Sequence, residues 1–251
     1  MSVSLVDNSA SGAGHRIRRV YSTMTGLDLV MYAGSDLATS MQNQAARGAV
    51  GGVVTSGGAP TFDASHIKIA SGATKLDWST LTETNEFTII TTMKPTGDLS
   101  VSNGRPHIAG WFDNNASIKG GSISISNAVN LRAQINYSVS GTPIDAFLNI
   151  GTYAVGELLV ERLVALSVYS GGATLYDLTK NVQASFSNAN PRALATGRGF
   201  RLGSNYNTTG TGPVDLSKTL LFRGVGLSKG EIDAVAIPIR SYLLDVEGIA
   251  V

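Results

Sequence analysis

The sequence predicts an all-β fold, an antiparallel β-sandwich of the jelly-roll kind with a short C-terminal helix. Three observations predict it. Apolar and polar residues alternate in several short segments, glycine-rich turns separate these segments, and one capped amphipathic helix follows near the C-terminus. Sandwiches often reach 251 residues as one unit. We therefore expect a jelly-roll domain over residues 60–251, and residues 1–59 as N-terminal strands and a loop, either part of the same domain or a short lead-in.

The clearest strand lies between Leu131 and Ser140. Every second residue in it is apolar, and the residues between them are polar. This period of two is typical of an antiparallel strand with one buried and one solvated face. Ile123 and Ile125 alternate with serines just before it, and Asn127 lies between the two runs. The two runs together predict a β-hairpin.

Other short segments are apolar and rich in β-forming residues, which predicts further strands. They are Arg16–Tyr21, Leu27–Tyr32, Phe87–Met93, Ile108–Phe112, Leu163–Tyr169, Thr174–Leu178, Phe200–Gly203 and Thr219–Val225. Gly-rich and Asn-Gly turns separate most of them, with no helical period in between. The close spacing predicts a sandwich or a barrel.

The helix is predicted near the C-terminus. Ser228 and Glu231 form an S-x-x-E capping box, in which each side chain accepts a hydrogen bond from a free backbone N–H. An apolar stripe with helical spacing follows from Ile232 to Leu243. Because proline disrupts a helix interior, Pro238 predicts a kink or two short helices.

Composition excludes several classes of function. The net charge is +1 and only 15% of the residues are charged. No basic stripe stands out beyond the short run His15–Arg19, which is typical of a solvated strand face, so the clustered cations of a nucleic-acid binder are not indicated. With no cysteine, the chain has no disulfide, thiolate metal site or cysteine nucleophile. No apolar run approaches the roughly 20 residues that cross a bilayer, so we expect no membrane insertion. The N-terminus lacks the pattern of a secretory signal.

No catalytic or metal-binding group stands out. Glu231 and Asp233 are spaced like a glycosidase carboxylate pair, but they fall in the first turn of the predicted helix, where acids favour the positive end of the dipole. The three histidines, His15, His66 and His107, have no ligand-like spacing. We expect a non-enzymatic protein with no cofactor and no metal.

Two clusters are typical of sugar binding, because aromatic faces stack on sugar rings while amides and carboxylates bind hydroxyls. The first is Trp111 with Asp113, Asn114 and Asn115, and the second is Arg201 with Asn205, Tyr206 and Asn207. The other interpretation is a core tryptophan followed by an Asx turn. Asp113 and Asn115 also have oxygens that suit Ca²⁺, although six ligands cannot be counted.

The order of these features resembles the concanavalin A-like lectin and glucanase superfamily, and within it the laminin-G-like domains. The resemblance lies in Pro60–Ile69, Glu86–Pro95, Arg162–Tyr176, Phe200–Gly203 and Leu227–Ile232. It implies two stacked antiparallel sheets and a glycan- or protein-binding face. The signatures of the hydrolytic members and the calcium-site pattern are not matched.

The absence of cysteine and of an export signal, with the Gly, Ser, Thr and Asn content, is similar to bacteriophage tail-fibre and tail-spike tips, which are usually trimers. We expect a receptor-binding domain on a virion tail, made in the host cytoplasm, that recognises a bacterial surface polysaccharide as a homotrimer. Two alternatives stay open: a structural or assembly module of the virion without a ligand, and a polysaccharide-degrading enzyme. Fold alone does not decide between them.

Overall fold

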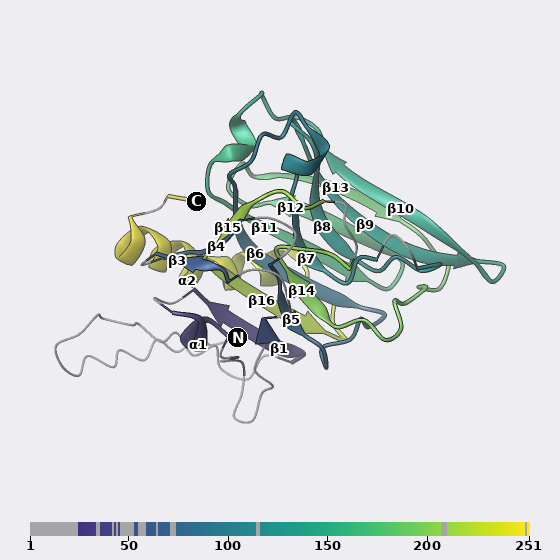
Figure 1. Ribbon diagram of the computed structural model, residues 1–251. Helices are drawn as coiled ribbons and strands as arrows, with labels where there is room; N and C mark the ends of the chain where they lie inside the picture. Colours follow the sequence, from purple (N-terminus) through teal and green to yellow (C-terminus); the bar gives the residue numbers. More distant parts are fainter. Residues whose placement is uncertain are drawn as a thin grey trace.

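The computed structural model describes residues 25–33, 36–41, 43, 45, 53–54, 59–63, 65–70, 74–113, 116–206, 210–248 and 250–251. These residues form two stacked β-sheets with a helix against one of them (Figure 1). Every strand pairing in this part of the chain is antiparallel. The predicted all-β sandwich with a C-terminal helix is therefore confirmed.

The first sheet has nine strands in the order β13-β12-β11-β6-β15-β4-β3, and β16 joins β6 to β1. Its strands are β1 (Leu27–Tyr32), β3 (Thr61–Phe62), β4 (Ile67–Ile69), β6 (Phe87–Pro95), β11 (Arg162–Tyr169), β12 (Gly172–Asp177), β13 (Val182–Ser187), β15 (Val214–Leu216) and β16 (Lys218–Arg223). The strand predicted at Arg16–Tyr21 lies outside the described residues, whereas β1 lies where it was predicted.

The second sheet has seven strands in the order β10-β9-β8-β7-β14-β5-β2. Its strands are β2 (Val53–Val54), β5 (Leu76–Trp78), β7 (His107–Gly110), β8 (Ser122–Asn127), β9 (Asn130–Val139), β10 (Thr142–Ile150) and β14 (Phe200–Leu202). The predicted hairpin is β8–β9, and β9 pairs along its whole length with β10 at the sheet edge. Two single 3₁₀ turns, η1 (Ser102–Gly104) and η2 (Glu157–Leu159), lie in the loops.

The main core lies between the sheets. The apolar residues of the alternating strands point into it, for example Leu131, Ala133 and Ile135 from β9 and Leu166 from β11, all fully buried. The alternate residues of β9, which are Arg132, Gln134, Asn136 and Ser138, therefore face outward. The outer face of the second sheet is consequently polar.

A second core lies between the outer face of the first sheet and α2 (Lys229–Glu247), while the short α1 (Leu37–Ser40) contacts β1. Ser228 and Glu231 form the predicted capping box. The prediction of a break at Pro238 is wrong, because one helix of 19 residues continues through it. Its apolar stripe packs on the sheet on both sides of the proline, and Val235 and Ile239 are almost fully buried. The helix therefore covers the outer face of the first sheet, and loops border the outer face of the second sheet.

Candidate functional site

Trp111 lies in the main core and has no exposed surface. Its Nε1 donates a hydrogen bond to the Leu81 carbonyl oxygen at 2.7 Å. Its ring packs edge-on against Phe87 and Phe200, with centroids 5.0 and 5.2 Å away. The interpretation of Trp111 as a sugar-stacking platform is therefore wrong, because a ring buried in the core offers no face to a ligand.

Tyr206 connects the two clusters that the sequence indicated. The Arg201 guanidinium lies 3.2 Å above the centre of its ring, and that of Arg198 lies 4.9 Å away. The Tyr206 hydroxyl accepts from the Gly199 N–H at 2.7 Å and donates to the Gly199 carbonyl at 3.0 Å. Burial raises the pKa of this phenol. Tyr206 thus joins two cations and a loop rather than standing free on the surface.

Buried ion pairs hold the rest of these clusters. Asp113, 4% exposed, accepts from the Arg198 guanidinium at 2.5 Å, and Arg201 donates to Asp77 Oδ2 at 2.7 Å. Arg201 also donates to the Asn205 carbonyl oxygen at 3.2 Å. The structure therefore brings Asp113, Arg201, Asn205 and Tyr206 together. The remaining predicted site residues, Asn114, Asn115 and Asn207, lie outside the described residues.

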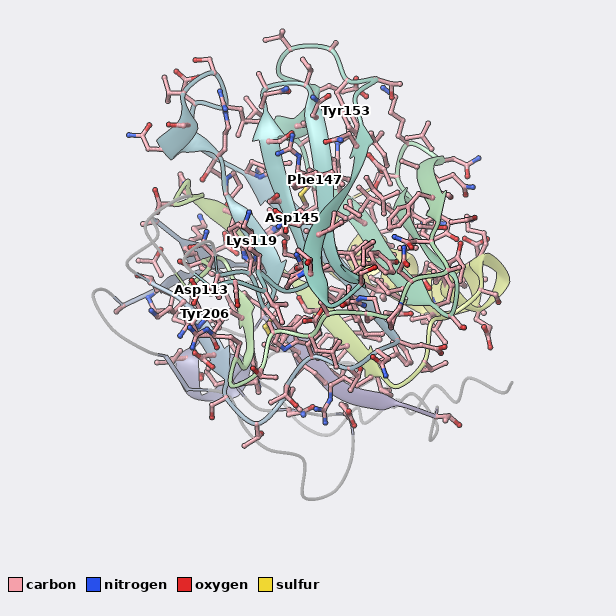
Figure 2. The ribbon with its side chains drawn as sticks, turned by 90° about the vertical axis from the view of Figure 1, so that its right-hand side faces the viewer. Asp113, Lys119, Asp145, Phe147, Tyr153 and Tyr206 are labelled. Atoms are coloured by element: carbon pink, nitrogen blue, oxygen red, sulfur yellow. The ribbon has the colours of Figure 1, made fainter. Side chains whose placement is uncertain are left out.

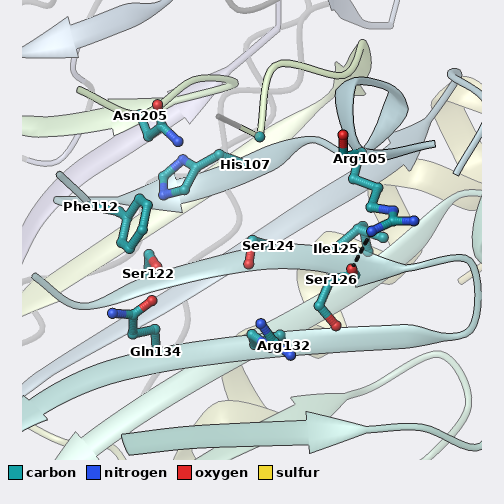
Figure 3. A pocket seen from close by; sticks show the side chains of 12 residues that line it. Arg105, His107, Phe112, Ser122, Ser124, Ile125, Ser126, Arg132, Gln134 and Asn205 are labelled. Carbon is teal, nitrogen blue, oxygen red and sulfur yellow. Dashed lines mark hydrogen bonds between the residues drawn. The ribbon is translucent and has the colours of Figure 1, made fainter. Parts of the chain in front are cut away.

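A pocket of about 260 Å³ lies beside this network on the outer face of the second sheet (Figure 3). Strands β7, β8 and β9 form its floor, and its walls include Ser102, Arg105, Asn205 and Gly210. It is lined by hydroxyl, amide, guanidinium and aromatic groups: Ser102, Arg105, His107, Phe112, Ser122, Ser124, Ile125, Ser126, Arg132, Gln134, Asn205 and Gly210. Among the predicted site residues that the structure describes, Asn205 lines the pocket.

The pocket lining has buried polar atoms without a hydrogen-bond partner among the described residues, on Gln134 and Ser126 as well as on the His107 ring. Gln134 is 6% exposed, and its amide nitrogen makes no hydrogen bond to a described residue. The Ser126 hydroxyl oxygen is also buried and makes no hydrogen bond to a described residue. A buried polar group without a partner is destabilising by about 1–3 kcal/mol, so native proteins retain few of them. These groups are suited to a polar ligand.

His107 forms part of the pocket floor as a neutral imidazole. Burial lowers its pKa to about 3, and the charge of Arg201 acts in the same direction. Its ring stacks on Phe112 with centroids 6.1 Å apart. A neutral imidazole has one N–H donor and one acceptor, which suits a hydroxyl group.

The buried neutral His107 makes stability depend on pH. In the unfolded chain His107 takes up a proton below pH 6.5, whereas in the native protein it stays neutral down to about pH 3. Stability therefore falls as pH decreases through this window. We expect His107→Gln to flatten the slope of unfolding free energy against pH by up to about 1.4 kcal/mol per pH unit. Denaturant unfolding at a series of pH values measures this slope.

His66 is the matched control, because its pKa is shifted the other way. Although burial lowers this pKa, ion pairs with Glu161 at 3.0 Å and Asp63 at 3.3 Å raise it overall. Its stabilising contribution is complete below pH 6.5 and is lost as pH rises through the folded pKa. His66→Gln should thus leave the slope of unfolding free energy against pH unchanged in the acidic range where His107 acts. Parallel curves for wild type and His107→Gln below pH 6.5 would contradict a neutral His107.

Phe147 on β10 is an aromatic residue near the pocket that the sequence interpretation missed. Its side chain is 47% exposed, and it lies opposite Gln134 in the β9–β10 register (Figure 2). The Arg132 guanidinium lies 5.0 Å from the centre of its ring. The alternation of Ile144, Ala146 and Leu148 would have indicated this strand and the outward direction of Phe147.

Among the described residues that line the pocket, none carries a carboxylate. Glu231 and Asp233, the tempting pair in the sequence, are on α2 against the other sheet. Glu231 accepts hydrogen bonds from Ser228, and Asp233 pairs with Lys229 at 2.6 Å. A glycosidase needs two carboxylates beside the scissile bond. The described lining of the pocket thus presents hydroxyl, amide, guanidinium and aromatic groups, and the carboxylate pair suggested by the sequence lies elsewhere.

The described residues contain no group of three His, Cys, Asp or Glu side chains placed to hold a metal ion. Asp113, which the sequence suggested for Ca²⁺, is paired with Arg198 instead. Within the described part of the chain, no helix is both long and apolar enough to span a bilayer.

No protein-family model and no curated protein matches the chain. Solved structures do match its fold. The botulinum neurotoxin serotype G binding domain aligns with a TM-score of 0.61 at 12% identity, over 86% of this chain and 51% of that chain. The serotype D binding domain aligns with a TM-score of 0.60 at 13% identity, over 85% and 52%. The chain thus spans about half the length of these toxin domains.

A carbohydrate-binding module is also similar. The CBM40 of the Ruminococcus gnavus IT-sialidase, solved with bound α2,3-sialyllactose, aligns with a TM-score of 0.52 at 18% identity, over 68% of this chain and 96% of that chain. At such identities the likeness shows a shared sandwich fold.

Proposed function

We propose that this protein is a glycan-binding domain and that the pocket on the outer face of the second sheet is its binding site. The observation that carries the proposal is the buried Gln134 amide, which has no partner among the described residues and faces a polar pocket. Serines, a neutral His107 and an amide offer donors and acceptors of the kind that sugar hydroxyls need. Phe147 adds an exposed aromatic ring beside them.

The structural neighbours support this proposal. The matched toxin structures are binding and receptor-binding domains, and the CBM40 was solved with a bound sugar. A pocket of about 260 Å³ is slightly below the roughly 300–1,000 Å³ of sites that enclose drug-sized ligands, which suits one or two sugar residues. The rest of a longer glycan then crosses the exposed face toward Phe147.

The proposal includes a biological setting. The protein is a receptor-binding domain of a phage tail fibre, of the concanavalin A-like kind over residues 60–251, and its ligand is a bacterial surface polysaccharide. Composition supports this setting, since the chain has no cysteine and 29 glycines. A homotrimer would present three weak sites together and raise avidity. Light scattering measures the oligomer, and adsorption to bacterial cells measures the receptor.

Glycan titration of Gln134→Ala tests the site directly. The ligand is first identified on a glycan array, and its affinity is then measured by calorimetry. We expect Gln134→Ala to weaken binding about tenfold, because a lost hydrogen bond in a buried site is worth about 0.5–1.5 kcal/mol and misplaced neighbours add to it. Gln183→Ala, an exposed glutamine of β13 in the other sheet, is the matched control and should bind normally.

Two outcomes would contradict the proposal. If neither the array nor bacterial cells bind the protein, the alternative of an assembly module without a ligand is favoured. If a glycan binds and both glutamine variants bind it equally well, the site lies elsewhere on the surface.

A further inference from the structure

Three acidic side chains on or next to the second sheet each pair with a basic group at 2.5–2.7 Å. The pairs are Asp77 with Arg201, Asp113 with Arg198, and Asp145 with Lys119; Lys119 and Asp145 are seen beside Phe147 in Figure 2. The opposite charges in each pair cancel locally, so the charge of the pocket comes from the residues that line it.

The pocket itself has two guanidinium groups and no carboxylate. Neither Arg105 nor Arg132 forms an ion pair with a described residue. His107 is neutral, so it neither adds to this charge nor balances it. The pocket therefore holds about two uncompensated positive charges in a partly buried position, where an anion is attracted more strongly than in bulk water.

Arg105 is fixed in place by main-chain carbonyls. Its guanidinium nitrogens donate to the carbonyl oxygens of Leu99 at 2.9 Å and Ser100 at 2.7 Å. A third bond, to the Ser126 carbonyl oxygen at 3.0 Å, is drawn in Figure 3. Carbonyl oxygens satisfy its hydrogen bonds without neutralising its charge. Arg105 thus acts as a fixed positive charge at one wall.

Arg132 is held in one orientation, but only part of its guanidinium donates hydrogen bonds to described residues. Its Nε donates to Asn149 Oδ1 at 3.0 Å, and its planar head lies over the Phe147 ring. The two terminal nitrogens make no hydrogen bond to a described residue. A guanidinium held at Nε and stacked on a ring has less rotamer entropy to lose, and it offers the paired donors that match a carboxylate.

From this arrangement we propose that the pocket selects glycans with an anionic sugar residue, and that Arg132 binds the anionic group. This inference rests on the proposed glycan-binding function and adds the ligand class. Arg105 contributes fixed charge, Gln134 and His107 bind the hydroxyls of the same residue, and Phe147 supports both Arg132 and the neighbouring sugar. Arg132 is thus the residue that determines specificity.

The test uses ligands that differ in charge alone. The probes are α2,3-sialyllactose with lactose, polygalacturonate with its carboxyl-reduced form, and dextran sulfate with dextran. We expect at least one charged member to bind about tenfold or more tightly than its neutral partner, with an affinity that falls at high salt. A preference for the charged ligand in the carboxylate pairs or in the sulfate pair identifies which anionic group the pocket recognises.

The variants locate the charge that is read. Arg132→Gln should remove the preference for the charged ligand, and Arg132→Lys should restore part of it, because lysine keeps the charge but loses the paired donors. Lys94→Gln is the control, a partly buried cation on β6 of the other sheet, and it should keep the preference. Unchanged unfolding midpoints verify that each variant is folded.

The outcomes separate the inference from the function beneath it. Equal affinity for charged and neutral members, or a preference that survives in Arg132→Gln, overturns the anionic-sugar inference and leaves glycan binding in place. Failure of every probe and of the whole glycan array overturns the proposed function. Charged ligands whose binding depends on Arg132 support both.

Discussion

Trp111→Ala is expected to lower the free energy of unfolding by about 3–5 kcal/mol. The indole fills the centre of the core between Phe87 and Phe200 and has no exposed surface. Truncation leaves a cavity, removes two edge-on aromatic contacts and leaves the Leu81 carbonyl without its donor at 2.7 Å. Urea unfolding followed by circular dichroism measures the loss, and an unchanged m-value verifies two-state behaviour.

Phe147→Ala is the matched control, because the sequence indicated Trp111 for stacking on a sugar and the structure indicates Phe147 instead. Phe147 is 47% exposed, so its truncation should change stability by less than about 1 kcal/mol while weakening glycan binding. If Trp111→Ala does not fold, Trp111→Phe should fold with a smaller loss and bind the glycan normally. Normal stability with impaired binding in a Trp111 variant would contradict its assignment to the core.

Glu83→Gln is expected to destabilise the protein by about 3–5 kcal/mol, the range for breaking a buried ion pair. The Glu83 side chain is fully buried. One of its oxygens accepts from the Gly121 N–H at 2.9 Å and from Arg192, and the other accepts from the Ala195 N–H at 2.8 Å. An amide of the same shape places an NH₂ group against one of these donors and leaves Arg192 without its counter-ion.

Asp233→Asn is the control for this substitution, since it makes the same chemical change in a surface pair. Asp233 pairs with Lys229 at 2.6 Å on the surface of α2, and both side chains are about 40% exposed. Surface pairs contribute about 0–1 kcal/mol. Chemical denaturation of both variants in one buffer provides the comparison. Equal losses in the two would show that burial of Glu83 has no energetic consequence.

The regular elements were largely predictable from the sequence. β9 follows a strict alternation, and a strand that buries one face must have it. The start of α2 was predictable because a capping box is satisfied within four residues. Capping hydrogen bonds and apolar alternation both depend on residues that are close in the sequence. These elements could therefore be predicted without knowledge of the fold.

The candidate site was predictable only in part. Asn205 and Tyr206 were indicated by composition, and the structure does place them in and beside the pocket. His107, Gln134 and Arg132 were not indicated, because their roles depend on the pairing of β7, β8 and β9. Residues that pair across these strands, such as His107 and Ser124, are distant in the chain, and no local pattern connects them.

The sequence by itself determined the all-β class, most of the strands, the C-terminal helix and the absence of cysteine chemistry, because alternation, capping and composition are local properties. Only the tertiary structure decided that Trp111 faces the core while Phe147 faces outward. It also decided that Asp77, Asp113 and Asp145 pair with cations, whereas Arg105 and Arg132 form no ion pair with a described residue. Burial and charge compensation depend on which distant segments pack together. The stacking of two sheets, rather than any local motif, therefore produces the pocket and its charge.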